Sequence, residues 1–365
     1  MLRLAALVTA LAIGLTGCQA RTVAQKVSPS PSASPTPSPP APSSAPSPTP
    51  SPPPAASPSP RATPSPIPAP PRVAVVGPSG APFTVGGAPG QGPVQHVAPG
   101  VVLPIQAIRS GWARVLTPCE QVGWVRLGDA TTIARATVVL DPGHGGAGEP
   151  GAAGQGGLAE KDVNLDVAKQ AASLLQARGV DTVLTRTGDY MATIAFRVQV
   201  ADALGAAAFV SIHHNAMPDG PRSSPGTETF YQYTSPSSKR LAGLLYQEGV
   251  SALTAFPATW VGNTDAGARW RLNDRGGDYY GILRLSDQHH LTASLAEMAF
   301  VSNPSEEALL RRPDVRSGEA QAISRALVRF LTTRDPGSGF SIPHPRKEPA
   351  GGGGGREGCV DPIGP

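Results

Sequence analysis

Short apolar runs alternate with helical patterns between residues 134 and 333. Residues 138–140 and 208–212 are runs of β-forming residues, which predicts two buried strands. Between them, residues 164–178 place apolar side chains at helical spacing, and Gly179 is suited to end that helix. Strands separated by helices of this length predict an α/β fold with a mainly parallel sheet and helices on both faces.

A different pattern covers residues 73–133. Short apolar segments alternate with Gly, Pro and Ser, which predicts a small all-β module. Residues 111–115 (GWARV) and 123–127 (GWVRL) resemble the final hairpin of a bacterial SH3-like barrel. In exported hydrolases such modules usually bind the cell wall. The alternative is a structural module that positions the catalytic unit, and the sequence leaves the two open.

The first 72 residues have the pattern of an export signal followed by a linker. Arg3 and the apolar run at residues 4–15 predict a signal peptide over residues 1–18. The sequence LTGC at its end resembles a bacterial lipobox, which implies lipidation of Cys18. We therefore expect a protein tethered to the outer face of the cytoplasmic membrane, or located in the periplasm or cell wall. An ordinary secretory signal is the alternative. Residues 19–72 are rich in Pro and Ser and predict a disordered linker.

Composition adds two constraints. The chain has 365 residues with 42 prolines, more than a compact domain carries, and a net charge of +4, too mild to predict binding to nucleic acid. Residues 334–365 are rich in Gly and Pro and predict a disordered tail, apart from what Cys359 ties down. Three cysteines are present, and lipidation would use one, so Cys119 and Cys359 are predicted to pair in an oxidising compartment. An unpaired cysteine on a flexible tail is the alternative.

Four polar residues lie where strands end or helices begin. His144 follows the first strand, and Glu160 precedes a helix after a glycine-rich loop. A second strand ends in His213 and His214, and Glu297 follows the apolar residues 293–296. Two histidines and one glutamate are a common ligand set for catalytic zinc. Because His213 and His214 alternate across a strand, only one of them should face the metal.

The sequences DPGHGG, GLAEKDVNL, FVSIHHNA and LAEMAFVSNP, in this order, resemble the motifs of zinc-dependent N-acetylmuramoyl-L-alanine amidases. The resemblance covers residues 136–333 and implies the phosphorylase/hydrolase-like fold, peptidoglycan as substrate, and Zn²⁺ as cofactor. It implies zinc ligands at His144, Glu160 and His213, with Glu297 as the catalytic glutamate. His214 and Ala299 depart from the family pattern, where a small residue and a glycine are usual.

Further residues are weaker candidates. Asn215 and Arg275 are predicted to contact substrate, although Asn215 could instead brace the second histidine and Arg275 could form a surface ion pair. Asp141 could orient the His144 loop, and Glu228 could face the site. Two other functions compete with the amidase: a zinc peptidase using the same ligands, and a non-catalytic wall-binding lipoprotein.

Overall fold

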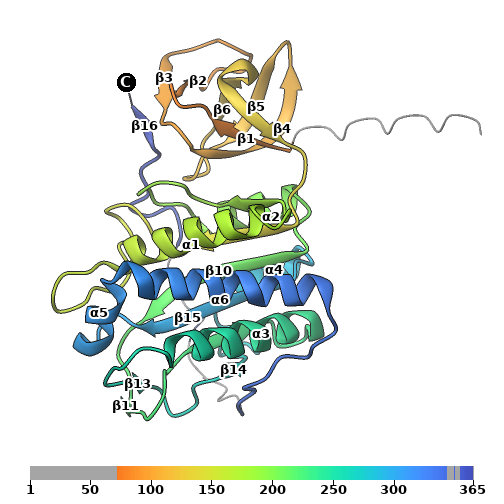
Figure 1. Ribbon diagram of the computed structural model, residues 1–365. Coiled ribbons are helices and arrows are strands. Elements are labelled where there is room, and N and C mark those ends of the chain that lie inside the picture. The colour runs from red at the N-terminus through yellow and green to blue at the C-terminus, as the bar shows by residue number, and fades with distance from the viewer. Residues whose placement is uncertain (1–71, 343–348, 350–353, 365) are drawn as a thin grey trace, which may run out of the picture. The chain divides into compact units, whose positions relative to one another are not determined.

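The computed structural model describes residues 72–342, 349 and 354–364 (Figure 1). The expected signal peptide, the predicted lipidation site Cys18 and nearly all of the predicted linker lie outside these residues. Among the described residues, no helix has the length and apolar character needed to cross a membrane.

The predicted all-β module is present. It forms an antiparallel sheet in the order β16-β3-β2-β6-β5-β4-β1-β7, to which the C-terminal segment contributes β16. Its core contains Phe83, Leu103, Val115 and Val125, all completely buried. The strands are β1 (Val73–Val76), β2 (Ala81–Thr84), β3 (Val94–Val97), β4 (Val102–Arg109), β5 (Trp112–Leu116), β6 (Val122–Arg126), β7 (Ala130–Ile133) and β16 (Ile363–Gly364).

The second part of the chain contains a six-stranded sheet in the order β14-β12-β15-β10-β8-β9. Two two-residue strands, β11 (Gly220–Pro221) and β13 (Val261–Gly262), pair separately. The strands of the large sheet are β8 (Val138–Pro142), β9 (Thr182–Leu184), β10 (Ala208–Asn215), β12 (Glu228–Tyr231), β14 (Ala268–Arg269) and β15 (Ala293–Phe300).

Helices cover both faces of this sheet, as the sequence predicts (Figure 1). Side chains alternate along β8, so Val138 and Leu140 pack in the core with α1, α3 and α6, while Val139 packs in the core with α2 and α4. The helices are α1 (Glu160–Gln176), α2 (Ile194–Ala203), α3 (Pro236–Leu253), α4 (Gly281–Gln288), α5 (Pro304–Leu310) and α6 (Pro313–Thr332).

The expectation of a mainly parallel sheet is corrected to a mixed sheet. Strands β9, β8, β10 and β15 pair in parallel, but β12 is antiparallel to β15, and β14 follows the direction of β12. No helix lies between β10 and β12, so the chain re-enters the sheet from the edge at which β10 ends. Without a crossover connection the returning strand has to run the opposite way.

The C-terminal tail also differs from the expectation of disorder. Residues 354–364 are held by the predicted disulfide between Cys119 and Cys359, and by pairing of β16 with β3. Upstream of them, Gly339 accepts a hydrogen bond from the main chain of Ala268 at the edge of the large sheet. Composition predicted disorder here because the tail has few apolar residues, whereas the observed contacts are mostly main-chain and covalent.

Candidate functional site

The candidate site lies where three parallel strands end. His144 lies two residues after the end of β8, His213 lies near the end of β10, and Glu297 lies on the neighbouring strand β15, three residues before its end. His213 and Glu297 are register partners in the sheet. Because parallel strands end at the same edge, residues about 70 and 150 positions apart in the sequence come together here.

The three predicted metal ligands converge on one point. Glu160, the first residue of α1, has its Oε1 atom 3.2 Å from Nε2 of His144 and 3.0 Å from Nδ1 of His213. The three ligand atoms lie within 4.8 Å of one another, close enough to bind one metal ion. Glu160 is buried, whereas both histidines keep part of their rings exposed.

The pKa values of Glu160, His144 and His213 are shifted by burial and by the charges of neighbouring groups. Burial raises the pKa of Glu160, but hydrogen bonds and charges from both histidines outweigh that effect and hold it well below its usual value. Burial lowers the pKa of His144, yet Glu149 and Glu160 together raise it to about 9. The pKa of His213 is lowered, mainly by burial. Glu160 is therefore a carboxylate at neutral pH and could serve as an anionic metal ligand.

Two buried guanidinium groups hold the loop that carries His144. Arg186 donates to the carbonyls of Pro142 and Gly143, and Arg197 donates to the carbonyls of Pro142 and His144. His144 has a φ of +60°, a left-handed conformation that costs a non-glycine residue free energy. The two arginines satisfy the carbonyls of this turn and so stabilise the conformation that directs His144 at Glu160.

Asp141 anchors Arg197 beneath the loop. Its Oδ1 accepts a 2.7 Å hydrogen bond from Arg197, and Ser211 and Thr185 also donate to this carboxylate. Burial raises the pKa of Asp141, but the charge of Arg197 and the hydrogen bonds from Ser211 and Thr185 lower it below its usual value. Asp141 thus supports the His144 loop through Arg197.

Glycine is required where the loop passes the second histidine. A Cβ atom on Gly143 would lie 2.2 Å from Cε1 of His213, far inside van der Waals contact. The absence of a side chain at this position lets the backbone pass close to the imidazole ring of His213. The DPGHGG motif therefore provides the turn after β8, the candidate ligand His144, and the glycine that lets the backbone pass close to His213.

Glu297 occupies a position suited to proton transfer. Its Oε2 atom is buried and has no hydrogen-bond partner among the described residues. Burial raises the pKa of Glu297 well above its usual value, and the negative charges of Glu160 and Glu228 add to this effect. A carboxyl group with a raised pKa beside such a cluster can act as a general base and then as a general acid.

Asn215 of β10 and Glu228 of β12, the two strands that flank β15, form a hydrogen-bonded pair. Asn215 donates to Glu228 Oε2 over 2.6 Å, and Arg269 donates to Glu228 Oε1 over 2.5 Å. Glu228 is a register partner of Glu297 across the antiparallel pair. Asn215 therefore contacts Glu228 rather than the second histidine, and its role as a substrate contact stays a prediction.

His214 lies on the opposite face from the metal ligands, as strand alternation predicts. Its ring is completely buried, with Nδ1 2.7 Å from Asn164 Oδ1 and Nε2 3.3 Å from Glu319 Oε2. The side chain of Asn164 donates in turn to Glu160 Oε1 over 3.3 Å. His214 is thus linked to the ligand Glu160 through one intervening side chain.

A cavity of about 240 Å³ opens beside His144 and His213. Arg275 lies on an exposed turn, and its role as a substrate contact also stays a prediction. The cavity is lined by several residues that sequence reasoning missed: Glu149, Ile194, Arg197, Tyr279 and Tyr280. For Arg197 a signal existed, since it is a lone cation in the apolar helix sequence IAFRVQVADA. Nothing in the sequence singled out the two tyrosines.

The part of the chain that carries this site is similar to known proteins. A family model described as N-acetylmuramoyl-L-alanine amidase matches residues 138–329. The uncharacterized protein YqiI of Bacillus subtilis is 34% identical over 218 residues, covering 58% of this chain and 90% of that protein. The germination-specific N-acetylmuramoyl-L-alanine amidase of B. subtilis is 30% identical over 214 residues, covering 54% and 81%. The amidase AmiC of Neisseria meningitidis is 30% identical over 228 residues, covering 54% of this chain and 53% of AmiC.

Proposed function

This chain belongs to the N-acetylmuramoyl-L-alanine amidase family, and we propose that it hydrolyses the amide bond between the lactyl group of muramic acid and the first residue of the peptidoglycan stem peptide. The observation that carries this proposal is the convergence of His144, Glu160 and His213 beside Glu297, at the edge of a cavity. These four residues lie within residues 138–329, the range that the family model matches.

The ligand cluster suits zinc. Two imidazole nitrogens and one carboxylate oxygen are a donor set that catalytic zinc sites use, with a fourth position for water or substrate. His144, Glu160 and His213 would hold the ion. When bound, zinc would supply a Lewis acid that polarises the scissile carbonyl and lowers the pKa of water to about 7.

Glu297 supplies the proton transfers. Its carboxylate accepts the proton of the attacking water and then delivers it to the departing amide nitrogen. The raised pKa of Glu297 favours the first step, because a carboxylate with a higher pKa is a stronger base. Glu160 keeps its negative charge throughout, because its pKa lies well below the usual value.

Arg197 and the loop carbonyls keep the geometry of this site constant. The guanidinium ties His144 to the helix α2, whose first residue, Ile194, forms part of the cavity wall. Tyr279 and Tyr280 lie on the same cavity and offer apolar and hydroxyl surface to the substrate. These groups would orient the substrate and exclude part of the water.

Digestion of purified peptidoglycan, with and without a chelator, tests this proposal. We expect new free lactyl groups and N-terminal alanine, with loss of activity on chelation and recovery on addition of zinc. New ends within the stem peptide would identify a zinc peptidase instead, and no new ends with intact wall binding would identify a binding protein.

Two substitutions distinguish the proposed metal ligand Glu160 from the proposed catalytic residue Glu297. Glu160→Ala is expected to lose zinc and activity together, whereas Glu297→Ala is expected to retain zinc and lose about 10²-fold or more in rate. Asp162→Ala removes an exposed carboxylate from the same first turn of α1 and serves as the control. Near-normal turnover by Glu297→Ala would contradict its catalytic role.

We also propose that the protein is exported and attached to the membrane through a lipid on Cys18. The lipobox-like sequence after the apolar run supports this proposal. A Cys18→Ala variant should lose membrane association or processing, as measured by cell fractionation. Unchanged fractionation would contradict the lipid anchor.

A further inference from the structure

The helix α2 connects the catalytic cavity with residues outside the catalytic sheet. Ile194 and Arg197, in its first turn, both line the cavity, and Arg197 also binds the carbonyl of His144. Any displacement of the N-terminus of α2 would therefore move the cavity wall and the His144 loop together. Contacts that fix the N-terminus of α2 therefore affect the geometry of the catalytic cavity.

The first contacts to this helix end come from the β-module. Thr193, the N-cap residue of α2, donates its main-chain N–H to the carbonyl of Pro118 over 3.0 Å. Its hydroxyl donates to Glu120 Oε1 over 2.5 Å while accepting from the N–H of Phe196. Pro118 and Glu120 lie in the turn between β5 and β6, so the module reaches directly into the cap of the helix.

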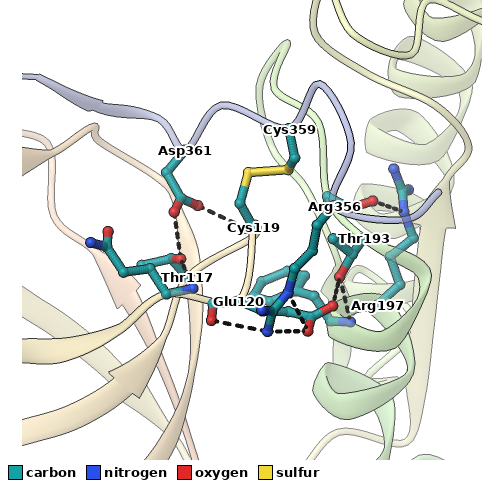
Figure 2. The surroundings of a disulfide bond; sticks show 11 residues. Thr117, Cys119, Glu120, Thr193, Arg197, Arg356, Cys359 and Asp361 are labelled. Carbon is teal, nitrogen blue, oxygen red and sulfur yellow. Dashed lines mark hydrogen bonds and ion pairs between the residues drawn. A yellow bond between two sulfur atoms is a disulfide. The ribbon is translucent and has the colours of Figure 1, made fainter.

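The second set of contacts comes from the C-terminal segment. The N–H of Ile194 donates to the carbonyl of Gly354 over 2.7 Å, which satisfies another of the free N–H groups at the helix start. Arg356 forms an ion pair with Glu120 at 2.6 Å. Figure 2 shows Thr193, Glu120 and Arg356 next to one another beside the disulfide.

The turn that carries Glu120 is itself fixed by that segment. Cys119 is bonded to Cys359, and its N–H donates to Asp361 Oδ1 over 2.8 Å. Thr117 donates to the other oxygen of the same carboxylate over 2.7 Å (Figure 2). Glu120 has a φ of +65°, so its side chain direction depends on a strained turn that these contacts stabilise.

Apolar packing continues across the same boundary. Val73, Val102 and Leu116 of the β-module belong to one buried cluster with Phe196 of α2 and Val183 of β9. A module that served only to bind the wall would not need a shared core with the helix of the catalytic cavity. The contacts favour the positioning role over a detached wall-binding role.

We propose that Glu120 is a positioning residue for the catalytic site, and that residues 354–364, locked by the disulfide, hold it in place. It acts through the Thr193 cap on α2, and through Arg197 on the His144 loop. The β-module and the C-terminal segment are then parts of the catalytic unit. This inference deepens the proposed amidase function and rests on it for its activity readout.

The test compares Glu120→Ala with Glu120→Gln in the full chain. Glutamine keeps an oxygen that can accept from Thr193 but loses the ion pair with Arg356, so its kcat should lie closer to that of the unsubstituted protein than to that of Glu120→Ala. Glu120→Ala should lower kcat on a soluble muramyl peptide by roughly 10-fold, with a smaller change in KM, because misplacement of a catalytic group acts mainly on the transition state. Zinc affinity, measured by chelator competition, should fall in the same order.

A second variant tests the same proposal without substituting Glu120, in case Glu120→Ala fails to fold. Cys119→Ser/Cys359→Ser keeps Glu120 but releases the C-terminal segment, and it should show the same direction of change in kcat and zinc affinity. Binding to sedimented cell walls should stay unchanged in all variants. Glu120→Ala with unchanged kcat and zinc affinity, or with a loss confined to wall binding, would overturn the proposal. If the unsubstituted protein did not cleave the muramyl peptide, the proposed function would fail, and zinc affinity alone would still decide the positioning role.

Discussion

Replacing His214 with leucine leaves the carboxylate of Glu319 without its hydrogen-bond partner. Both side chains are completely buried, and Nε2 of His214 lies 3.3 Å from Oε2 of Glu319. The other oxygen, Oε1, already has no partner among the described residues. The carboxylate would therefore be buried with neither oxygen satisfied.

The hydrogen-bond network indicates where the protons lie. The amide of Asn164 donates to Gly143 and Glu160, so its Oδ1 accepts, and Nδ1 of His214 carries a proton. On the other side of the ring, Nε2 of His214 lies within hydrogen-bond distance of Oε2 of Glu319. Glu306 is also buried, and burial raises its pKa to about 7, with the charge of Glu319 adding to this effect.

The magnitude follows from this burial. Removing one partner of a buried ionic pair typically costs about 3–5 kcal/mol, whereas replacing both partners with apolar residues of similar size is often neutral. His214→Leu is therefore expected to lower the free energy of unfolding by about 3–5 kcal/mol. His214→Leu/Glu319→Met should recover much of this loss, although Asn164 Oδ1 stays unpaired in both variants.

Urea unfolding of the metal-free protein, followed by far-ultraviolet circular dichroism, measures these differences. Glu319→Met alone completes the double-mutant cycle. The expected coupling is that the double variant is at least about 2 kcal/mol more stable than His214→Leu. A double variant no more stable than His214→Leu would refute the buried pair as the cause.

Three other predictions concern the loop before His144, the loss of stability at low pH, and the disulfide. Gly143→Ala should abolish zinc binding, measured by metal analysis, because its Cβ would overlap His213; full zinc occupancy would contradict this. The pKa of Asp141 is held below the usual 3.8, so its stabilising contribution is present above pH about 4 and lost as the pH falls further. Asp141→Asn should thus be less stable at pH 7 yet lose less on acidification, as followed by melting temperature; parallel curves would count against it. Cys119→Ser/Cys359→Ser opens a loop of 240 residues and should cost at most about 5 kcal/mol in urea unfolding; no change in the urea midpoint would show that the bond adds no stability.

Much of the site could be predicted from the sequence because strand ends carry its residues. His144, His213 and Glu297 each end or follow a short apolar run, and such runs are recognisable locally. Their convergence requires only that the three strands be parallel neighbours, which β8, β10 and β15 are. Glu160 was identifiable because it begins the helix that follows the glycine-rich loop.

The direction of β12 could not be predicted in the same way. Alternation of apolar residues identifies a strand but carries no information about its direction, which the connection before it determines. The connection from β10 to β12 contains the short strand β11 and no helix, so the chain returns antiparallel. This return brings Glu228 beside Glu297, where its charge raises the pKa of Glu297.

The order of the C-terminal segment depends on partners that composition does not describe. Sequence criteria for disorder weigh how much apolar surface a segment can bury, and this segment has little. Its contacts instead use the carbonyl of Gly354, the carboxylate of Asp361 and the sulfur of Cys359, each paired with a group more than 150 residues away. Such order exists only once the β-module and α2 are in place. Residues 354–364 are therefore ordered only in the assembled catalytic unit. Their release should displace the start of α2, and with it Arg197, while the six-stranded sheet stays folded.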